Sequence, residues 1–280
     1  MLSESKAKDL KRLAIDIRKK TLYQIAKLGL GHVGGSMSVC ELMACMYGEI
    51  LNVDPNNPAM PDRDRFILSK GHAGPAMYSV LAIKGFFPLE ELDTLNKPGT
   101  NLPSHTDCNK TKGVDMTTGS LGQGISSAAG IALACKMDKR DNYTYCVLGD
   151  GECQEGQVWE AAMFAAHYNL TRFILFVDKN VYQLDGPTDK CMSLGRLDEK
   201  FEKFGFYVQE VDGHDVTTIC DAVLNAKTQQ EKPSAIILNT VKGKDCPVTS
   251  RVANFHMMPF SMADYEEACE LYDRQLAELG

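Results

Sequence analysis

The sequence predicts an α/β fold, a parallel β-sheet with helices on both faces. After residue 143, short β-favouring runs alternate with helical stretches, and connections of this length join parallel strands by right-handed crossovers. The chain has 280 residues, 44% of them hydrophobic, which is enough for one large core or two small ones. The expected strands are 144–148, 172–177, 206–211 and 234–240, and the helices between them are 154–168, 196–204 and 215–228.

The N-terminal part is expected to be mostly helical. Residues 3–28 form an amphipathic helix that Ser3 or Ser5 opens and that Gly29 and Gly31 end. The apolar stripe of this helix consists of Leu10, Leu13, Ile17 and Leu22. Further helices are expected at 42–51, 72–85 and 121–137, with a proline-rich loop at 54–62.

The C-terminal tail, residues 261–279, is predicted to be the last helix. Ser261 and Asp264 have the spacing of a capping pair at its start. No internal repeat, low-complexity segment or linker interrupts the sequence. We therefore expect a single domain over residues 1–280.

The composition excludes several classes of partner. With 30 basic and 37 acidic residues the net charge is −7, and no lysine or arginine run suggests binding to nucleic acid or to an anionic membrane. No apolar stretch approaches the ~20 residues that a membrane span needs, and residues 1–20 do not form an apolar targeting segment. The ten cysteines lack Cys-x-x-Cys spacing, which favours reduced thiols. These features predict a cytoplasmic protein.

The motif Gly149-Asp150-Gly151 follows the expected strand 144–148, and Asn180 follows the expected strand 172–177. Because the carboxyl ends of parallel strands meet at the edge where α/β folds bind ligands, both polar side chains are expected there. Oxygens of Asp150, Asn180 and the Tyr182 carbonyl can bind Mg²⁺ (or Ca²⁺), a cation that also binds phosphate. The two glycines let backbone N–H groups approach a diphosphate. Asp-Gly alone also forms ordinary turns, but the second strand with Asn180 favours a metal-diphosphate site.

Six stretches with distinctive motifs follow one another along the chain. They are residues 30–36, 62–72, 117–124, 149–152, 178–180 and 183–186. In this order they resemble the diphosphate-binding half of transketolases, a thiamin-diphosphate-binding fold, and the likeness continues more loosely through residues 241–244. A full-length transketolase continues with a pyrimidine-binding domain and a C-terminal domain. The chain is therefore similar to the N-terminal subunit of a split transketolase.

This resemblance implies that thiamin diphosphate is held between two chains. The present chain would bind the diphosphate, and a C-terminal transketolase subunit would supply the pyrimidine domain with its activating glutamate, in an α2β2 heterotetramer. The implied reaction transfers a two-carbon ketol unit from a ketose to an aldose. The ketose would be a sugar phosphate or a less usual sulfonated or branched sugar.

The resemblance also implies roles for single residues. Gly151 and His72 would contact the diphosphate, and Gly119 and Leu121 would lie beside the ring system of the cofactor. Glu155 would join a network between two cofactors at the dimer interface. The implied active-site histidines, which would bind donor hydroxyls or move protons, are His32, His72, His105 and His256.

Simpler structural interpretations stand beside these roles. Glu155 starts a helix, where a carboxylate interacts favourably with the dipole, and His72 can be a helix cap. His105 and His256 can be loop residues, because their flanking sequences depart from the family pattern. His32, between glycines, is expected in an exposed turn. The residues to which we assign a purely structural role are Trp159, His167 and His214.

Two other classes of function are also open. The α-subunit of another thiamin diphosphate enzyme, such as a 2-oxo-acid dehydrogenase, would share the metal motif but not the stretch 64–72 or the histidine set. A non-catalytic cofactor-binding protein would keep the fold without needing His32, His105 and His256 in one cavity. The position of these three rings therefore discriminates between the classes.

Overall fold

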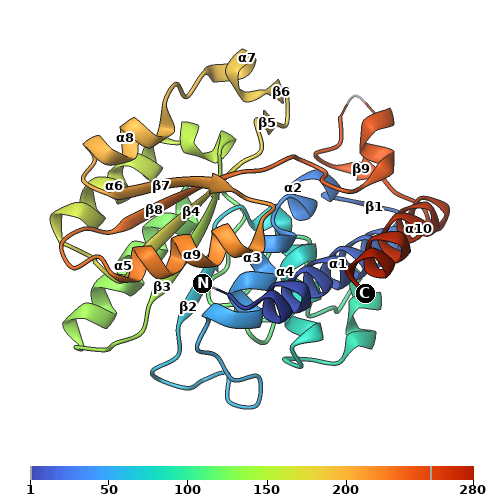
Figure 1. The fold of residues 1–280 in the computed structure, drawn as a ribbon, viewed down its shortest axis with the longest axis horizontal. Coiled ribbons are helices and arrows are strands. Elements are labelled where there is room, and N and C mark those ends of the chain that lie inside the picture. Colours follow the sequence, from blue (N-terminus) through green and yellow to red (C-terminus); the bar gives the residue numbers. More distant parts are fainter. Residues whose placement is uncertain (1, 253) are drawn as a thin grey trace.

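A five-stranded parallel sheet forms the centre of the computed structural model, which describes residues 2–252 and 254–280 (Figure 1). The strands are β2 (Arg65–Leu68), β3 (Thr144–Gly149), β4 (Phe173–Lys179), β7 (Tyr207–Asp212) and β8 (Ser234–Asn239), in the order β2-β3-β4-β8-β7. Every neighbouring pair is parallel, so the predicted sheet is confirmed.

Helices cover both faces of this sheet, because the side chains of each strand alternate between two apolar cores. Tyr145 and Val147 pack in one core, whereas Cys146 and Leu148 pack in the other. The first core contains side chains of α1 (Glu4–Leu28), α2 (Val33–Met37), α3 (Cys40–Cys45), α4 (Gly74–Ile83), α9 (Val216–Lys227) and α10 (Met262–Leu279). The second contains those of α5 (Gln123–Met137), α6 (Gly156–His167) and α8 (Leu197–Lys203).

The remaining elements are short. Two antiparallel ribbons pair β1 (Leu30–Gly31) with β9 (Met258–Pro259) and β5 (Tyr182–Gln183) with β6 (Gly186–Pro187), and α7 (Thr188–Met192) follows β6. The 3₁₀ turns are Gly71–Ala73, Leu89–Thr94, Gly151–Gln154 and Pro247–Arg251, and Met46–Ile50 form a π-helix. In Figure 1, β5, β6 and α7 project from the top of the molecule, away from the sheet.

The first and last helices begin and end as predicted. The Ser3 side chain accepts a hydrogen bond from the Lys6 N–H at the start of α1, and Gly29 ends this helix with a left-handed φ of 83°. Ser261 and Asp264 form a reciprocal capping box at the start of α10. The two helices lie side by side (Figure 1).

Some predicted boundaries are wrong. The helix predicted at 42–51 is α3 followed by the π-helix, and the one predicted at 154–168 starts at Gly156 because residues 151–154 form a 3₁₀ turn. The strand β2 was not predicted, because its four residues are too few to show a period of two. Over the described ranges, no helix combines the length and apolar character needed to cross a membrane.

Candidate active site

A cavity of about 290 Å³ lies at the carboxyl edge of the sheet, where β2, β3, β4 and β8 end. It brings together every residue that was predicted for the site. Those residues are His32, His72, His105, Gly119, Leu121, Asp150, Gly151, Glu155, Asn180, Tyr182 and His256. Two lysines for which the sequence suggested no role, Lys70 and Lys242, also line the cavity.

Asp150 lies just beyond the end of β3 and is 2% exposed. Its Oδ1 accepts a hydrogen bond from the Gly151 N–H at 2.8 Å, and its Oδ2 accepts one from the Val181 N–H at 2.7 Å. Burial, reinforced by the charge of Asp178, raises the pKa of Asp150 to about 6. A divalent cation in the cavity would relieve this penalty, so the position suits a metal ligand.

The next two predicted ligands are held by the end of β4. Asn180 donates from Nδ2 to Asp178 Oδ2 at 2.8 Å, which orients its amide, and its Oδ1 accepts the Tyr182 N–H at 3.2 Å. The Tyr182 carbonyl accepts a hydrogen bond from Lys242 Nζ at 3.1 Å. In the part of the chain that the structure describes, no group of three or more His, Cys, Asp or Glu residues could hold a metal. The predicted set, with one carboxylate, one amide and one carbonyl, would need phosphate oxygens to complete it.

A buried ion pair lies beneath the cavity. Lys70 Nζ contacts Asp178 Oδ2 and donates to the Gly35 carbonyl at 2.9 Å. Asp178 also accepts hydrogen bonds from the Ser38 and Thr240 hydroxyls. Burial acts to raise the pKa of Asp178, but Lys70 and these donors hold that pKa below its ordinary value. The pair joins the ends of β2, β4 and β8, and it keeps one positive and one negative charge under the site.

Four histidine rings meet on one side of the cavity. The centroid of the His32 ring lies 5.6 Å from that of His72, 5.4 Å from that of His105 and 5.4 Å from that of His256. The centroids of His72 and His256 are 4.8 Å apart. The prediction that His32 lies in an exposed turn is wrong, because this residue is buried at the start of α2.

All four imidazoles have lowered pKa values. Burial, followed by His105 and Lys242, lowers the pKa of His32 to about 4, and burial with Lys242 and His32 lowers that of His256 to about 3. Burial and Lys70 lower the pKa of His72 well below its ordinary value, and burial lowers that of His105. The rings are therefore neutral at pH 7, and each offers one N–H donor and one acceptor nitrogen.

A short ribbon brings His256 to the other histidines. Gly31 pairs with Met258 in the β1 and β9 ribbon, and the Gly34 N–H donates to the Phe255 carbonyl at 3.0 Å. A Cβ atom on Gly34 would lie 2.6 Å from that carbonyl oxygen, so only glycine permits this approach. The segment before α10 is thus fixed against the segment after α1.

Lys242 reaches into the site from beyond the end of β8. Its Nζ lies 3.1 Å from the Tyr182 carbonyl, 3.3 Å from the Gln183 carbonyl and 3.2 Å from His256 Nδ1. The side chain is buried, and burial followed by the charge of Lys70 lowers its pKa to about 8. Its only sequence signal was the likeness of residues 241–244 to the family, because the reach of its side chain depends on tertiary contacts.

Two glutamates beside the metal motif have different surroundings. Glu152 is buried and accepts hydrogen bonds from the Ser69 hydroxyl, the Gly122 N–H and the Gly149 N–H. It therefore holds the ends of β2 and β3 and the start of α5 together. Glu155, by contrast, is exposed at the rim of the cavity.

Two residues with a predicted structural role, Trp159 and His167, do not line the cavity. The indole of Trp159 packs on Phe201 and Phe204 and donates from Nε1 to the Cys153 carbonyl. His167 contacts the Tyr168 ring on α6, outside the cavity.

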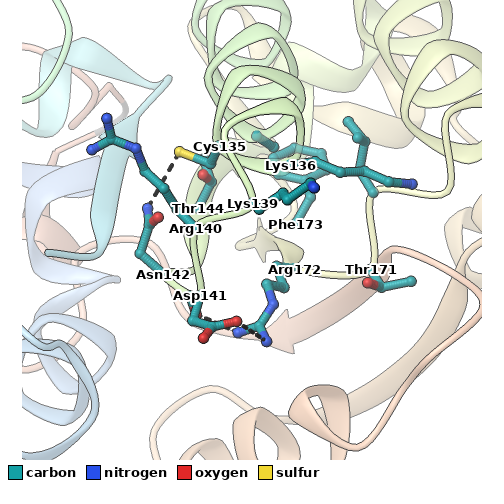
Figure 2. Close-up of a pocket in the computed structure, with 12 residues that line it drawn as sticks. Cys135, Lys136, Lys139, Arg140, Asp141, Asn142, Thr144, Thr171, Arg172 and Phe173 are labelled. Atoms are coloured by element: carbon teal, nitrogen blue, oxygen red, sulfur yellow. Dashed lines mark hydrogen bonds and ion pairs between the residues drawn. The ribbon is translucent and has the colours of Figure 1, made fainter. Parts of the chain in front are cut away.

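A second cavity, of about 240 Å³, lies at the opposite edge of the sheet, where β3 and β4 begin (Figure 2). It contains none of the predicted site residues. Its basic side chains bind neighbouring groups: Arg172 pairs with Asp141, and Lys136 donates to the Tyr168 and Asn169 carbonyls. The candidate active site is therefore the cavity at the carboxyl edge.

Comparison with known proteins identifies the family. Residues 10–274 match the family described as transketolase, thiamine diphosphate binding domain. The 6-deoxy-6-sulfo-D-fructose transketolase subunit SqwG of Clostridium sp. (strain MSTE9) is 56% identical over 236 residues, which are 84% of this chain and 86% of that protein. An apulose-4-phosphate transketolase subunit of Phocaeicola vulgatus is 35% identical over 262 residues, which are 94% of this chain and 93% of that protein.

Solved structures give the same result. A transketolase from Leishmania mexicana superposes with a TM-score of 0.87 at 28% identity, covering 94% of this chain but 41% of that one. The chain thus spans less than half of that transketolase and most of the separate subunits to which it is similar. It belongs to the transketolase family, whose thiamin diphosphate-binding domain it matches.

Proposed function

We propose that this chain forms the diphosphate and metal half of an active site that transfers a two-carbon ketol unit from a ketose to an aldose. The observation that carries the proposal is the convergence of four histidines, Asp150 and Asn180 on one cavity. A non-catalytic binding protein would not need the histidines there. A 2-oxo-acid dehydrogenase subunit would share the metal motif, but the family match favours ketol transfer.

Asp150, Asn180 and the Tyr182 carbonyl would bind Mg²⁺ (or Ca²⁺), and the metal would bind the diphosphate. Gly151 and His72 would contact the same diphosphate, Lys242 would add a positive charge beside it, and Gly119 and Leu121 would lie against the ring system. Thiamin diphosphate, when bound, supplies the electron sink for cleavage of the C–C bond of the ketose. The fit rests on Asp150, a carboxylate that is buried at the cavity and whose pKa is raised by burial and by the charge of Asp178.

The histidine cluster would handle the hydroxyl groups of the sugar. Because His32, His105 and His256 are neutral, each ring nitrogen can donate to or accept from a hydroxyl, and an acceptor nitrogen can take a proton. His32 is buried and the other two rings are half-buried, which would limit the access of bulk water to the reacting carbon.

The other half of the site would come from a C-terminal transketolase subunit that carries the pyrimidine domain, in an α2β2 assembly. Exposed apolar side chains on the segment 181–192, beside the cavity, suit such a contact, and Glu155 would face the interface from the rim. The exposed residues of this segment are Val181, Tyr182, Leu184 and Met192. All ten cysteines are free, which supports a reducing compartment such as the cytoplasm.

We also propose that the donor ketose carries an anionic group distant from the reacting carbon. The relative at 56% identity is named for 6-deoxy-6-sulfo-D-fructose, and a second relative is named for apulose 4-phosphate. Sulfonate and phosphate are both tetrahedral anions. The higher identity favours a sulfonated ketose.

The test is ketol transfer by this chain with and without the candidate partner, in the presence of thiamin diphosphate and Mg²⁺. Donors should be 6-deoxy-6-sulfofructose and xylulose 5-phosphate, each at equal concentration. Turnover with both chains, absent with either alone, is expected. Turnover by this chain alone would contradict the split site, and a preference for xylulose 5-phosphate would contradict the proposed donor.

A further inference from the structure

His214 was assigned a purely structural role, but its ring lies between the core and the segment that carries Lys242. It follows β7 in the turn that leads to α9. Its Nδ1 lies 3.1 Å from Glu41 Oε2, and its Nε2 accepts a hydrogen bond from the Val241 N–H at 2.9 Å. Because Nε2 accepts, Nδ1 carries the proton and donates to Glu41. Both ring nitrogens are therefore used.

The contact with Glu41 fixes the ring. Glu41, on α3, is buried and pairs through Oε1 with Arg18, which is buried on α1. Burial acts to raise the pKa of Glu41, but Arg18 and His214 hold that pKa below its ordinary value. A charged carboxylate between a guanidinium and an imidazole N–H has little freedom to move, so the orientation of His214 is set by the core.

The contact with Val241 fixes the segment before Lys242. The backbone on either side is also held, because the Thr240 N–H donates to the Lys179 carbonyl and the Gly243 N–H donates to the Gly34 carbonyl at 2.9 Å. The Val241 side chain is 58% exposed and cannot anchor this position by packing. The His214 ring is the side chain that holds the Val241 backbone, one residue from the lysine.

We propose that His214 is a positioning residue for the active site: through the Val241 backbone it directs Lys242 toward the Tyr182 carbonyl, His256 and the diphosphate. This inference rests on the proposed function, in which Lys242 adds a charge beside the diphosphate. The lysine ammonium group is a point charge at the end of a flexible four-carbon chain. The strength of its interaction with an anion therefore depends on where the backbone of the lysine is held.

The experiment is a double-mutant cycle on the affinity for thiamin diphosphate, measured by calorimetry with Mg²⁺ and both subunits. His214→Ala should weaken binding about tenfold, and Lys242→Met should weaken it at least as much. The double variant should bind like Lys242→Met alone, because His214 acts through Lys242. If the losses of binding free energy in the two single variants add in the double variant, His214 only supports the fold and the proposal is wrong. An unchanged affinity in His214→Ala would also overturn the proposal.

Two conservative variants separate positioning from folding. His214→Asn can still donate to Glu41 but does not reach Val241, whereas His214→Gln places an amide near the Nε2 position. We expect the Asn variant to keep the melting temperature and lose affinity, and the Gln variant to regain most of it. Equal affinities for the two would contradict the role of the Val241 contact. His167→Ala, outside the cavity, is the matched control, and a wild type without affinity would instead refute the proposed function.

Discussion

Asp150 shows how burial prepares a side chain for a cation. Its carboxylate accepts two backbone N–H groups, yet its pKa is raised to about 6 because it lies buried near a second carboxylate. The backbone donors set its direction, and the remaining penalty favours binding of a positive ion.

Asp150→Asn keeps the shape of this side chain and removes its charge. We expect the Mg²⁺-dependent affinity for thiamin diphosphate to fall at least about tenfold, because in the proposed site a divalent ion would lose its one anionic protein ligand. Calorimetry with both subunits measures this affinity. Asp138→Asn, at the opposite edge of the sheet, should bind as the wild type does. Full affinity in Asp150→Asn would remove this residue from the metal site.

His32 makes the folding stability depend on pH. Its pKa is about 4 in the folded chain and near 6.5 when unfolded, so the unfolded chain binds more protons between these values. The contribution of the neutral His32 ring to the free energy of unfolding is therefore present above about pH 6.5 and is lost as the pH falls toward 4. Between pH 6.5 and 5 this one ring should account for about 1 kcal/mol, because solvent screens part of the effect of the pKa shift. Urea unfolding of the wild type and His32→Asn at both pH values should reveal a smaller pH dependence in the variant.

Glu152 links three elements with one carboxylate. Ser69 follows β2, Gly149 ends β3 and Gly122 precedes α5, and each donates to this side chain. Because the cavity is built where these elements end, its shape depends on this contact.

Glu152→Ala would leave these buried donors without their acceptor. The free energy of unfolding should fall by about 2–4 kcal/mol, since each unsatisfied buried group carries a penalty of about 1–3 kcal/mol that relaxation partly offsets. Urea denaturation measures the loss. Glu160→Ala, on the exposed side of α6, is the control and should change the free energy of unfolding by less than about 0.5 kcal/mol. Equal effects of the two substitutions would contradict the linking role.

The elements that sequence predicted best are those with a strong local signal. The alternation after residue 143, the Ser3 cap and the capping box of α10 each depend on neighbouring residues. Asp150 and Asn180 could be placed because they directly follow strands. In contrast, β2 is too short for a period to emerge.

Tertiary contacts explain what sequence could not predict about the site. His32 is buried because His72, His105 and His256 surround it, and these rings come from distant segments. Likewise, Lys242 is directed by hydrogen bonds to residues about sixty positions away. No local pattern encodes such contacts.

At the scale of the whole molecule, apolar surface lies beside the active-site cavity. The segment 181–192 projects from the body at the top of Figure 1, and the exposed fraction of Leu184 in this segment is 55%. An exposed apolar surface beside a cavity is typical of an interface.

Leu184→Asp should weaken association with the proposed pyrimidine-domain partner at least about tenfold, because it would introduce an unpaired charge into a desolvated contact. Sedimentation equilibrium of the mixed chains measures the association. Leu224→Asp, which changes an exposed leucine on α9, is the matched control. Both variants should keep the melting temperature of the wild type, and equal association constants would place the partner elsewhere.

The pairing of β1 with β9 joins residues from opposite ends of the chain, and it carries His256 to the other three imidazoles. The strands β3 and β4 are separated by one helix and can pair early, whereas closing nearly the whole chain into a loop is slow. The edge with Asp150 and Asn180 therefore depends on shorter connections than the histidine cluster does. We therefore expect the histidine cluster to be completed after the sheet, because the place of its fourth ring depends on this long-range pairing.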